Sequence, residues 1–425
     1  MHHYRTKMAS IKKWLIIDTD AGVDDAVAIV LGLKLAKKYD FEVKALTTTF
    51  GNCDVEQVTK NVSKTRAACG LDYKTGPAIV KGCSYPLLGL ESRIDATYFH
   101  GLDGLGNNEF PDEPIDGTGE EDRVGVEVGV GVVPDESSEP DSHELNSNSN
   151  KKRKIESNSA STSTPESAPA SACESKHDEL RAAYELIRLV ALAKSKDIKV
   201  SVVILGPMTN LAHAMKINNT FHRDIDDLVI MGGCGNARGN ISRTAEFNFA
   251  ADPEAASYVF NILEQSNDNS MKHNVNTTLV SWELTLAHYL PWNLFDKYIS
   301  ENTSKNSRSN DFLYQICKTI YSKDNRHLPI DNFDETVGNS TQTQHEHEHG
   351  AIICDALCVA VALDPTLITC SRHVNVEIEL DGKLTRGQSV VDWGCYDGVD
   401  RVKNVKWVNS VNSEVYATMF SNIFD

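Results

Sequence analysis

Short apolar runs rich in β-branched residues alternate along the chain with longer amphipathic or apolar stretches of helical periodicity. The apolar runs are nearly continuous, which is typical of strands whose sheet is covered by helices on both faces. The pattern therefore predicts an α/β fold with an open, mostly parallel central sheet flanked by helices. The predicted strands are Trp14–Ile17, Val43–Thr49, Lys199–Leu205, Leu228–Met231 and Thr277–Trp282, and the predicted helices include Asp24–Lys38, Val55–Cys69, Asp178–Ser195 and Asp355–Leu363.

Two segments of low complexity interrupt this alternation. Residues 111–177 are a mixture of Ser, Asn, Glu and Pro that cannot bury enough apolar surface to offset the entropy of ordering the chain. Residues 332–350 include His345-Glu346-His347-Glu348-His349, but the neighbouring sequence supplies no turn or strand to fix metal ligands, so a solvated loop is the favoured interpretation. We predict one domain over residues 11–425, interrupted by a disordered acidic and serine-rich insert at 111–177 and by a low-complexity insert at 332–350.

The formal net charge of −18 argues against a protein that binds nucleic acid. Most of this charge is local, because residues 111–180 hold 17 acidic and 6 basic side chains. The apolar run Trp14–Ile17 is too short for a signal peptide or a membrane span, and the 10 cysteines are scattered without a CxxC pair. These features favour a cytoplasmic protein with reduced thiols. Lys151-Lys152-Arg153-Lys154 has the makeup of a nuclear import signal, although a solvated tract in an acidic linker is the favoured interpretation.

Four aspartates follow the first predicted strand closely, in the stretch WLIIDTDAGVDDAVAIV. Asp18, Asp20, Asp24 and Asp25 would repel one another unless a cation neutralised them. Gly22 permits a tight turn, so carboxylates from the strand end and the helix start can converge on one point. Capping the helix would need only one aspartate. The cluster predicts a site for a hard divalent cation at the carboxyl end of the sheet, where ligands bind in α/β folds.

DTDAGVDDAVAI resembles the N-terminal signature of the inosine-uridine-preferring nucleoside hydrolases, usually written DTDxGxDDxxAI. The resemblance covers almost all of the chain outside the two inserts. It implies a Rossmann-like hydrolase that cleaves ribonucleosides to ribose and free base, and that assembles as a homodimer or homotetramer. The other matching stretches are TTTFGN (47–52), HGLDGLG (100–106), GPMTNLA (206–212), MGGCGNARGN (231–240), AEFNFAADPEAA (245–256), CDALCVAVALDP (354–365) and LTRGQSVVDW (384–393).

The resemblance also implies one Ca²⁺ ion, held by the carboxylates of Asp20, Asp25 and Asp355 and by the backbone carbonyl of Leu205. This set leaves several of the roughly six to eight oxygen positions of calcium for ribose hydroxyls and a water. Asp20, next to that water, is implied as the general base.

Ribose binding is implied for a set of carboxylates and amides that suit sugar hydroxyls, namely Asp24, Asn52, Asn240, Glu246 and Asn248. The spacing of Glu246 and Asn248 fits an extended segment that presents both to one side. Taken alone, Asn240 fits a turn and Glu246 a surface acid, and the shared pattern favours the site. Their negative charge suits a reaction that passes through a ribosyl cation.

The histidine that the best-known members of the family carry before the late aspartate is replaced here by Cys354. A thiol is a poor general acid, with an ordinary pKa of about 8.5. His100 is the alternative donor to the leaving base, and an ordinary loop histidine is an equally good interpretation. Trp282 is a candidate for the wall of the base pocket, although a core tryptophan is the simpler interpretation.

Two other functions fit parts of the sequence. An Asp-x-Asp after the first strand resembles the haloacid-dehalogenase-type phosphatases, with Asp18 as nucleophile and Asp20 as acid, but this leaves the other aspartates unused. A catalytically silent nucleoside-binding protein in the nucleus, which Lys151–Lys154 would suit, would keep most of the pocket.

Overall fold

A nine-stranded sheet forms the centre of the computed structural model, which describes residues 13–89, 94, 96–112, 178–267, 275–300, 307–322, 350–394 and 397–425. The strand order is β10-β9-β11-β6-β5-β4-β1-β2-β3, and every neighbouring pair from β11 to β3 is parallel. Strands β9 and β10 add an antiparallel edge. The strands are β1 (Lys13–Thr19), β2 (Phe41–Thr48), β3 (Ala78–Lys81), β4 (Val200–Ile204), β5 (Asp227–Met231), β6 (Asn276–Val280), β9 (Ile368–Ile378), β10 (Ser389–Asp392) and β11 (Val405–Val411).

The strand order reverses next to β1, which pairs with β2 on one side and with β4 on the other. In open α/β sheets the crevice at such a reversal, outside the carboxyl ends of the strands, is the usual ligand site. The register aligns Asp18, near the end of β1, with Thr47 of β2 and Ile204 of β4. The aspartate-rich segment therefore leaves the sheet at the switch point.

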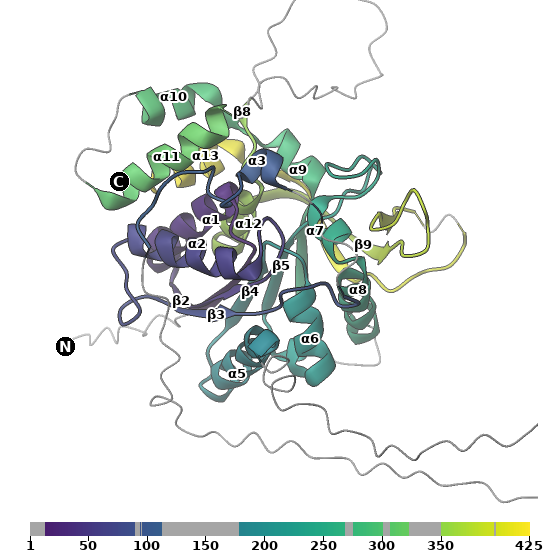
Figure 1. Cartoon of the computed structure of the whole chain (residues 1–425). Helices are drawn as coiled ribbons and strands as arrows, with labels where there is room; N and C mark the ends of the chain where they lie inside the picture. The colour runs from purple at the N-terminus through teal and green to yellow at the C-terminus, as the bar shows by residue number, and fades with distance from the viewer. Residues whose placement is uncertain are drawn as a thin grey trace, which may run out of the picture.

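Helices cover both faces of the sheet (Figure 1). Alternate residues of β1 divide between the two apolar cores: Leu15 and Ile17 face one, and Trp14 and Ile16 face the other. The first core includes side chains of α1 (Val23–Leu35), α2 (Val55–Ala68), α10 (Trp292–Ser300), α11 (Arg308–Ser322), α12 (Cys354–Leu363) and α13 (Ser413–Ser421). The second includes side chains of α5 (Arg181–Ser195), α6 (Thr209–Ile217) and α8 (Pro253–Asn267).

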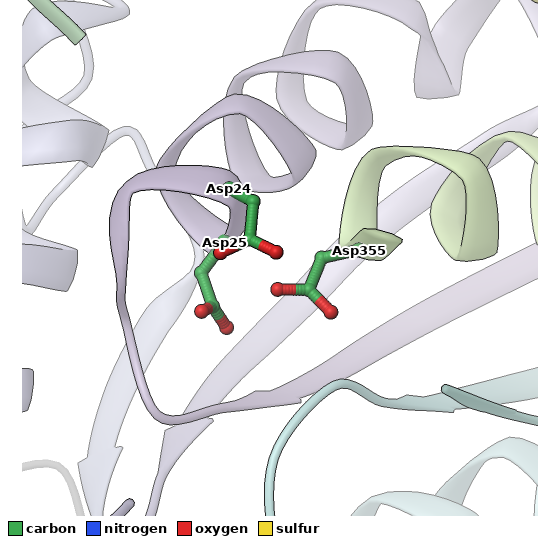
Figure 2. A group of neighbouring side chains, drawn as sticks. All are labelled: Asp24, Asp25 and Asp355. Carbon is green, nitrogen blue, oxygen red and sulfur yellow. The ribbon is translucent and has the colours of Figure 1, made fainter. Parts of the chain in front are cut away.

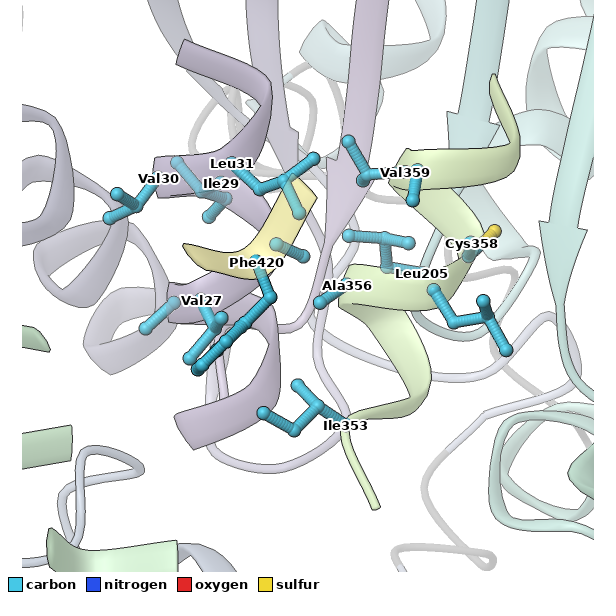
Figure 3. Close-up of a cluster of buried hydrophobic side chains, with 14 of the residues drawn as sticks. Val27, Ile29, Val30, Leu31, Leu205, Ile353, Ala356, Cys358, Val359 and Phe420 are labelled. Atoms are coloured by element: carbon cyan, nitrogen blue, oxygen red, sulfur yellow. The ribbon is translucent and has the colours of Figure 1, made fainter. Parts of the chain in front are cut away.

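Helices α1 and α12 are apolar on all sides, and every residue of α12 is buried. A helix of this kind belongs in a protein interior. The two helices pack together beside the sheet, with Ile29 and Leu31 of α1 in the same cluster as Ala356 and Val359 of α12 (Figure 3). Because both helices begin at the carboxyl end of the sheet, this core fixes where their first turns lie.

The predicted fold class is confirmed, and each predicted strand and helix is present with its boundaries shifted by a few residues. The prediction that the strand Thr277–Trp282 includes Trp282 is wrong. Strand β6 ends at Val280, and Ser281 caps the short helix α9 (Trp282–Ala287) by accepting a hydrogen bond from the Leu284 N–H at 3.4 Å. Strands β3, β9, β10 and β11 and helices α6, α8, α10, α11 and α13 were not among the predicted elements.

Most of both predicted inserts lies outside the described residues, as do Lys151–Lys154 and His345–His349. Gly350, placed at the end of the second insert, belongs to strand β8 (Gly350–Ala351), which pairs with β7 (Leu290–Pro291). None of the helices in the described ranges combines the length and the apolar character that a membrane span requires.

Candidate active site

A cavity of about 530 Å³ opens at the carboxyl ends of β1, β4 and β5. The fold brings together at this cavity all the candidate site residues except Asp25, whose carboxylate lies directly beneath. The residues of the set that line it are Asp20, Asp24, Asn52, His100, Leu205, Asn240, Glu246, Asn248, Trp282, Cys354 and Asp355. Residues far apart in the sequence thus form one acidic pocket.

The turn between β1 and α1 is closed by Asp25. Its Oδ2 accepts a hydrogen bond from the Gly22 N–H at 2.8 Å, and the Thr19 hydroxyl donates to its Oδ1. Gly22 is the N-cap of α1, and Ala21 adopts a left-handed backbone with φ of 40°. Asp24 therefore has no capping role, and its Oδ1 has no hydrogen-bond partner within the described part of the chain.

Three buried carboxylates approach one another at the start of α1 and α12. One oxygen from each of Asp24, Asp25 and Asp355 lies within 4.8 Å of the others, and the carboxylates of Asp24 and Asp355 face each other (Figure 2). Burial and the charge of Asp25 raise the pKa of Asp24 to about 7, and burial and Asp24 raise the pKa of Asp355 well above its ordinary value. Without a cation, burial and mutual repulsion therefore favour the protonated forms of Asp24 and Asp355.

Asp20 completes the acidic group from the end of β1. Burial and the charge of Asp25 raise its pKa well above the ordinary value, although its Oδ2 accepts a hydrogen bond from the Asn52 N–H at 3.0 Å. A Cβ at Gly51 would meet Asp20 Oδ2 at 2.0 Å, so the backbone can approach this carboxylate only because residue 51 is glycine.

The donor set fits a hard divalent cation. Besides the carboxylates, Leu205 lines the cavity, and its carbonyl accepts a hydrogen bond from Asn248 Nδ2 at 2.6 Å. A carbonyl oxygen has two lone pairs, so one remains for a cation. Asp24 Oδ1 lies 3.8 Å from His100 Nδ1 but accepts no hydrogen bond from the described residues, and a bound positive charge would satisfy this oxygen and relieve the mutual repulsion of the carboxylates. Oxygen-only donors of this kind are the ligands of Ca²⁺ and Mg²⁺.

Asp18 lies beneath this group and does not line the cavity. Its Oδ1 accepts hydrogen bonds from the Thr47 hydroxyl at 2.5 Å and from Asn210 Nδ2 at 2.8 Å, and burial raises its pKa to about 7. A carboxyl group that does not line the cavity cannot attack a phosphate ester bound there, so this position argues against the phosphatase interpretation.

The predicted extended segment at Glu246 and Asn248 is wrong, because Glu246 is the N-cap of helix α7 (Phe247–Ala251) and Asn248 lies within that helix. Glu246 accepts from the N–H groups of Asn248 at 2.9 Å and Gly233 at 2.8 Å. Burial nevertheless raises its pKa to about 7. Asn240 accepts from the Phe247 N–H at 2.9 Å, so the same helix start positions all three polar side chains.

The opposite wall holds the two candidate proton donors. Cys354 donates its thiol hydrogen to Thr285 Oγ1 at 3.5 Å, because that hydroxyl donates its own hydrogen to the Trp282 carbonyl at 2.8 Å. The sulfur therefore presents lone pairs to the cavity. His100 Nδ1 accepts a hydrogen bond from the Val23 N–H at 3.1 Å, which places the proton of the neutral ring on Nε2.

Sequence reasoning missed the apolar part of the cavity. Tyr98, Phe99, Met231, Phe247, Leu286 and Ile352 line it. Most of them lie one or two residues from a polar site residue, and this proximity was the only feature of the sequence that could have indicated them. Such a mixed lining is typical of pockets that take a small molecule with one apolar and one polar part.

The fold and the site together define an α/β protein whose sheet carries, at its switch point, an acidic pocket with oxygen donors suited to a divalent cation. Residues 15–418 match the family model of the inosine-uridine preferring nucleoside hydrolases, so the chain belongs to this family of N-glycosyl hydrolases. An inosine-uridine preferring nucleoside hydrolase of Leishmania major is 27% identical over 379 residues, which are 89% of this chain and 87% of the relative.

Other comparisons agree. A probable uridine nucleosidase 2 of Oryza sativa subsp. japonica is 27% identical over 89% of this chain and 82% of its own length. Among solved structures, an inosine-guanosine nucleoside hydrolase superimposes with a TM-score of 0.67 and 24% identity, covering 97% of this chain and 99% of its own. The structural match shows that the fold is shared.

Proposed function

We propose that this protein hydrolyses the N-glycosidic bond of ribonucleosides to ribose and free base, with Ca²⁺ as cofactor and Asp20 as general base. The observation that carries the proposal is the convergence of buried carboxylates from the segment after β1, from α1 and from α12 at a cavity that apolar side chains also line. The carboxylates suit a sugar that becomes positively charged, and the apolar side chains suit a flat base.

Asp20, Asp25, Asp355 and the Leu205 carbonyl would hold the ion. When bound, Ca²⁺ orients a water and lowers its pKa. Asp20 then takes the proton of the attacking water, and the water oxygen forms the new bond to the anomeric carbon as the bond to the base breaks. We assign Asp24 to the sugar hydroxyls, because it lines the cavity and Asp25 does not.

The polar side chains that line the cavity would orient the ribose, namely those of Asp24, Asn52, Asn240, Glu246 and Asn248. Developing positive charge on the sugar is stabilised by carboxylates that are already in place, so the acidic pocket favours the transition state over the neutral nucleoside. The leaving base faces His100 and Cys354. The ring hydrogen of His100 is at Nε2 and the thiol hydrogen of Cys354 is directed to Thr285, so we assign base contact to both residues. We assign to His100 a hydrogen bond to the departing base without proton transfer, because a neutral imidazole that lost this proton would become an imidazolate.

A catalytically silent nucleoside-binding protein is the second candidate, and it is supported by Cys354, whose thiol donates to Thr285 Oγ1 and is a poor general acid. We also propose a cytoplasmic location: the eight cysteines of the described residues are all free thiols, as expected in a reducing compartment. The homodimer or homotetramer remains a prediction, which sedimentation would test.

The test is release of free ribose from inosine, uridine, cytidine, adenosine and guanosine by the wild type and by Asp20→Ala. We expect release by the wild type, loss of activity on chelation with recovery on adding Ca²⁺, and a fall of at least about a hundredfold in the variant. If no nucleoside is cleaved while inosine still raises the melting temperature in Ca²⁺, the binding protein is the better account.

A further inference from the structure

Asn61 connects two separate parts of the active site from helix α2. It is fully buried, and its Nδ2 donates hydrogen bonds to the Ala21 carbonyl at 3.1 Å and to the Asp103 carbonyl at 2.7 Å. Its Oδ1 accepts from Gln57 Nε2, one helical turn earlier, at 2.9 Å. Both hydrogens of the amide are thus used on backbone carbonyls outside the helix, so this side chain does more than fill space.

The first carbonyl belongs to the acidic turn, defined here as residues 20–25. Ala21 has a φ of 40°, a conformation that residues with a Cβ rarely adopt, and it lies between Asp20 and the N-cap Gly22. A strained residue keeps its conformation only when its surroundings hold it. The hydrogen bond from Asn61 holds the carbonyl of Ala21, which lies in the turn between Asp20 and Asp25.

The second carbonyl belongs to the loop that follows His100, defined here as the His100 loop, residues 100–107. Asp103 accepts from the Leu105 and Asn107 N–H groups at 2.9 and 2.7 Å, so the loop is internally braced. A Cβ at Gly104 would meet Asn61 Nδ2 at 2.7 Å, so this close packing requires glycine. The loop also contacts the acidic turn directly, through the bond from the Val23 N–H to His100 Nδ1.

We propose that Asn61 is a positioning residue that couples the acidic turn to the His100 loop, so that cation binding at the turn orders the loop that carries His100. Asn61 touches neither the cavity nor the carboxylates and acts through the carbonyls of Ala21 and Asp103. Coupling of this kind is reciprocal, so ordering the loop also strengthens cation binding. The inference rests on the proposed function only in requiring that the site take a divalent cation.

The test compares Asn61→Ala with Gln57→Ala in the full-length protein. Gln57→Ala removes the third hydrogen bond of Asn61 and leaves both carbonyl contacts in place, so it is a matched control. Calcium affinity is measured by isothermal titration with Ca²⁺ alone, and hydrogen exchange of residues 100–107 is measured with and without Ca²⁺. Neither readout requires a nucleoside.

We expect Ca²⁺ to slow exchange in the His100 loop of the wild type and of Gln57→Ala. In Asn61→Ala the loop should no longer respond to Ca²⁺, and the affinity should fall by about tenfold or more. Wild-type affinity together with a wild-type exchange response in Asn61→Ala would overturn the proposal. If that variant does not fold, Asn61→Asp, which keeps the volume and loses the paired donors, is read by the same criteria.

The two proposals fail separately. If Ca²⁺ binds and the coupling follows the expected pattern while no nucleoside is cleaved, the positioning role of Asn61 stands and the hydrolase proposal falls. If nucleosides are cleaved and Asn61→Ala keeps the calcium affinity and the loop response, only the positioning role falls.

Discussion

Glu246 combines a structural role as a helix cap with a pKa that burial raises. It caps α7 with hydrogen bonds that favour its ionised form, yet burial outweighs them and raises its pKa from 4.5 to about 7. The native protein therefore holds a proton here, at pH values between these two, that the unfolded chain releases. This stabilises the native state fully below pH 4.5, and the stabilisation is lost as the pH rises through about 7.

The matching prediction concerns Glu246→Gln. Glutamine does not titrate, so the unfolding free energy of the wild type relative to the variant should decline by about 3 kcal/mol between pH 4.5 and 7 in the absence of ligands. Urea unfolding of both proteins across this range measures it. A difference that stays constant with pH would show that Glu246 is ionised throughout.

At the scale of elements, α1 and α12 have two tasks. Their sides build the core, and their first turns carry Asp24, Asp25 and Asp355. Because the acids are spaced by helix packing, a defect in that packing should also disturb the site. Helix N-termini carry partial positive charge, which partly compensates the buried carboxylates before any ion binds.

Ile29→Ala tests the packing. Ile29 is a fully buried side chain of α1 in the core that this helix shares with α12. Truncating it should lower the unfolding free energy by about 2 to 5 kcal/mol. Val415→Ala, at a site on α13 that is 37% exposed, is the control and should change it by less than about 0.5 kcal/mol. Denaturant unfolding of both variants measures the change. Similar small losses of unfolding free energy in the two variants would contradict the role assigned to this core.

For the whole molecule, sequence periodicity was sufficient for the fold class because the parallel strands are buried on both faces and therefore read as apolar runs. It was insufficient for the antiparallel edge: the first half of β9 is largely exposed, and β10 is only four residues long, so neither shows a clear apolar run. The predicted strand ran on to Trp282 because that residue extends the apolar run that begins at Thr277. The sequence did not reveal the helix start, because Ser281 caps α9 through a single hydroxyl hydrogen bond that forms only in the folded protein.

The site was predictable to the extent that its chemistry is local. Asp18, Asp20, Asp24 and Asp25 lie close together in sequence, so their mutual repulsion can be inferred without the structure. The different roles of these aspartates could not be predicted, because the hydrogen bonds of Asp25 with Thr19 and Gly22 form only in the folded turn. Asn61 gave no signal, since an asparagine in a helix acquires meaning only from Ala21 and Asp103, which are 40 and 42 residues away in sequence.

Hydrolysis by water at the anomeric carbon is the central claim, and isotope labelling tests it most directly. A cleaved nucleoside is incubated with the calcium-loaded wild type in water enriched in the heavy oxygen isotope, with orthophosphate absent, and the ribose is trapped by reduction before its oxygen exchanges. The account predicts one heavy oxygen at the anomeric carbon and none in the base, with incorporation lost in Asp20→Ala. Ribose that carries only light oxygen, or labelling unaffected by the loss of Asp20, would contradict it.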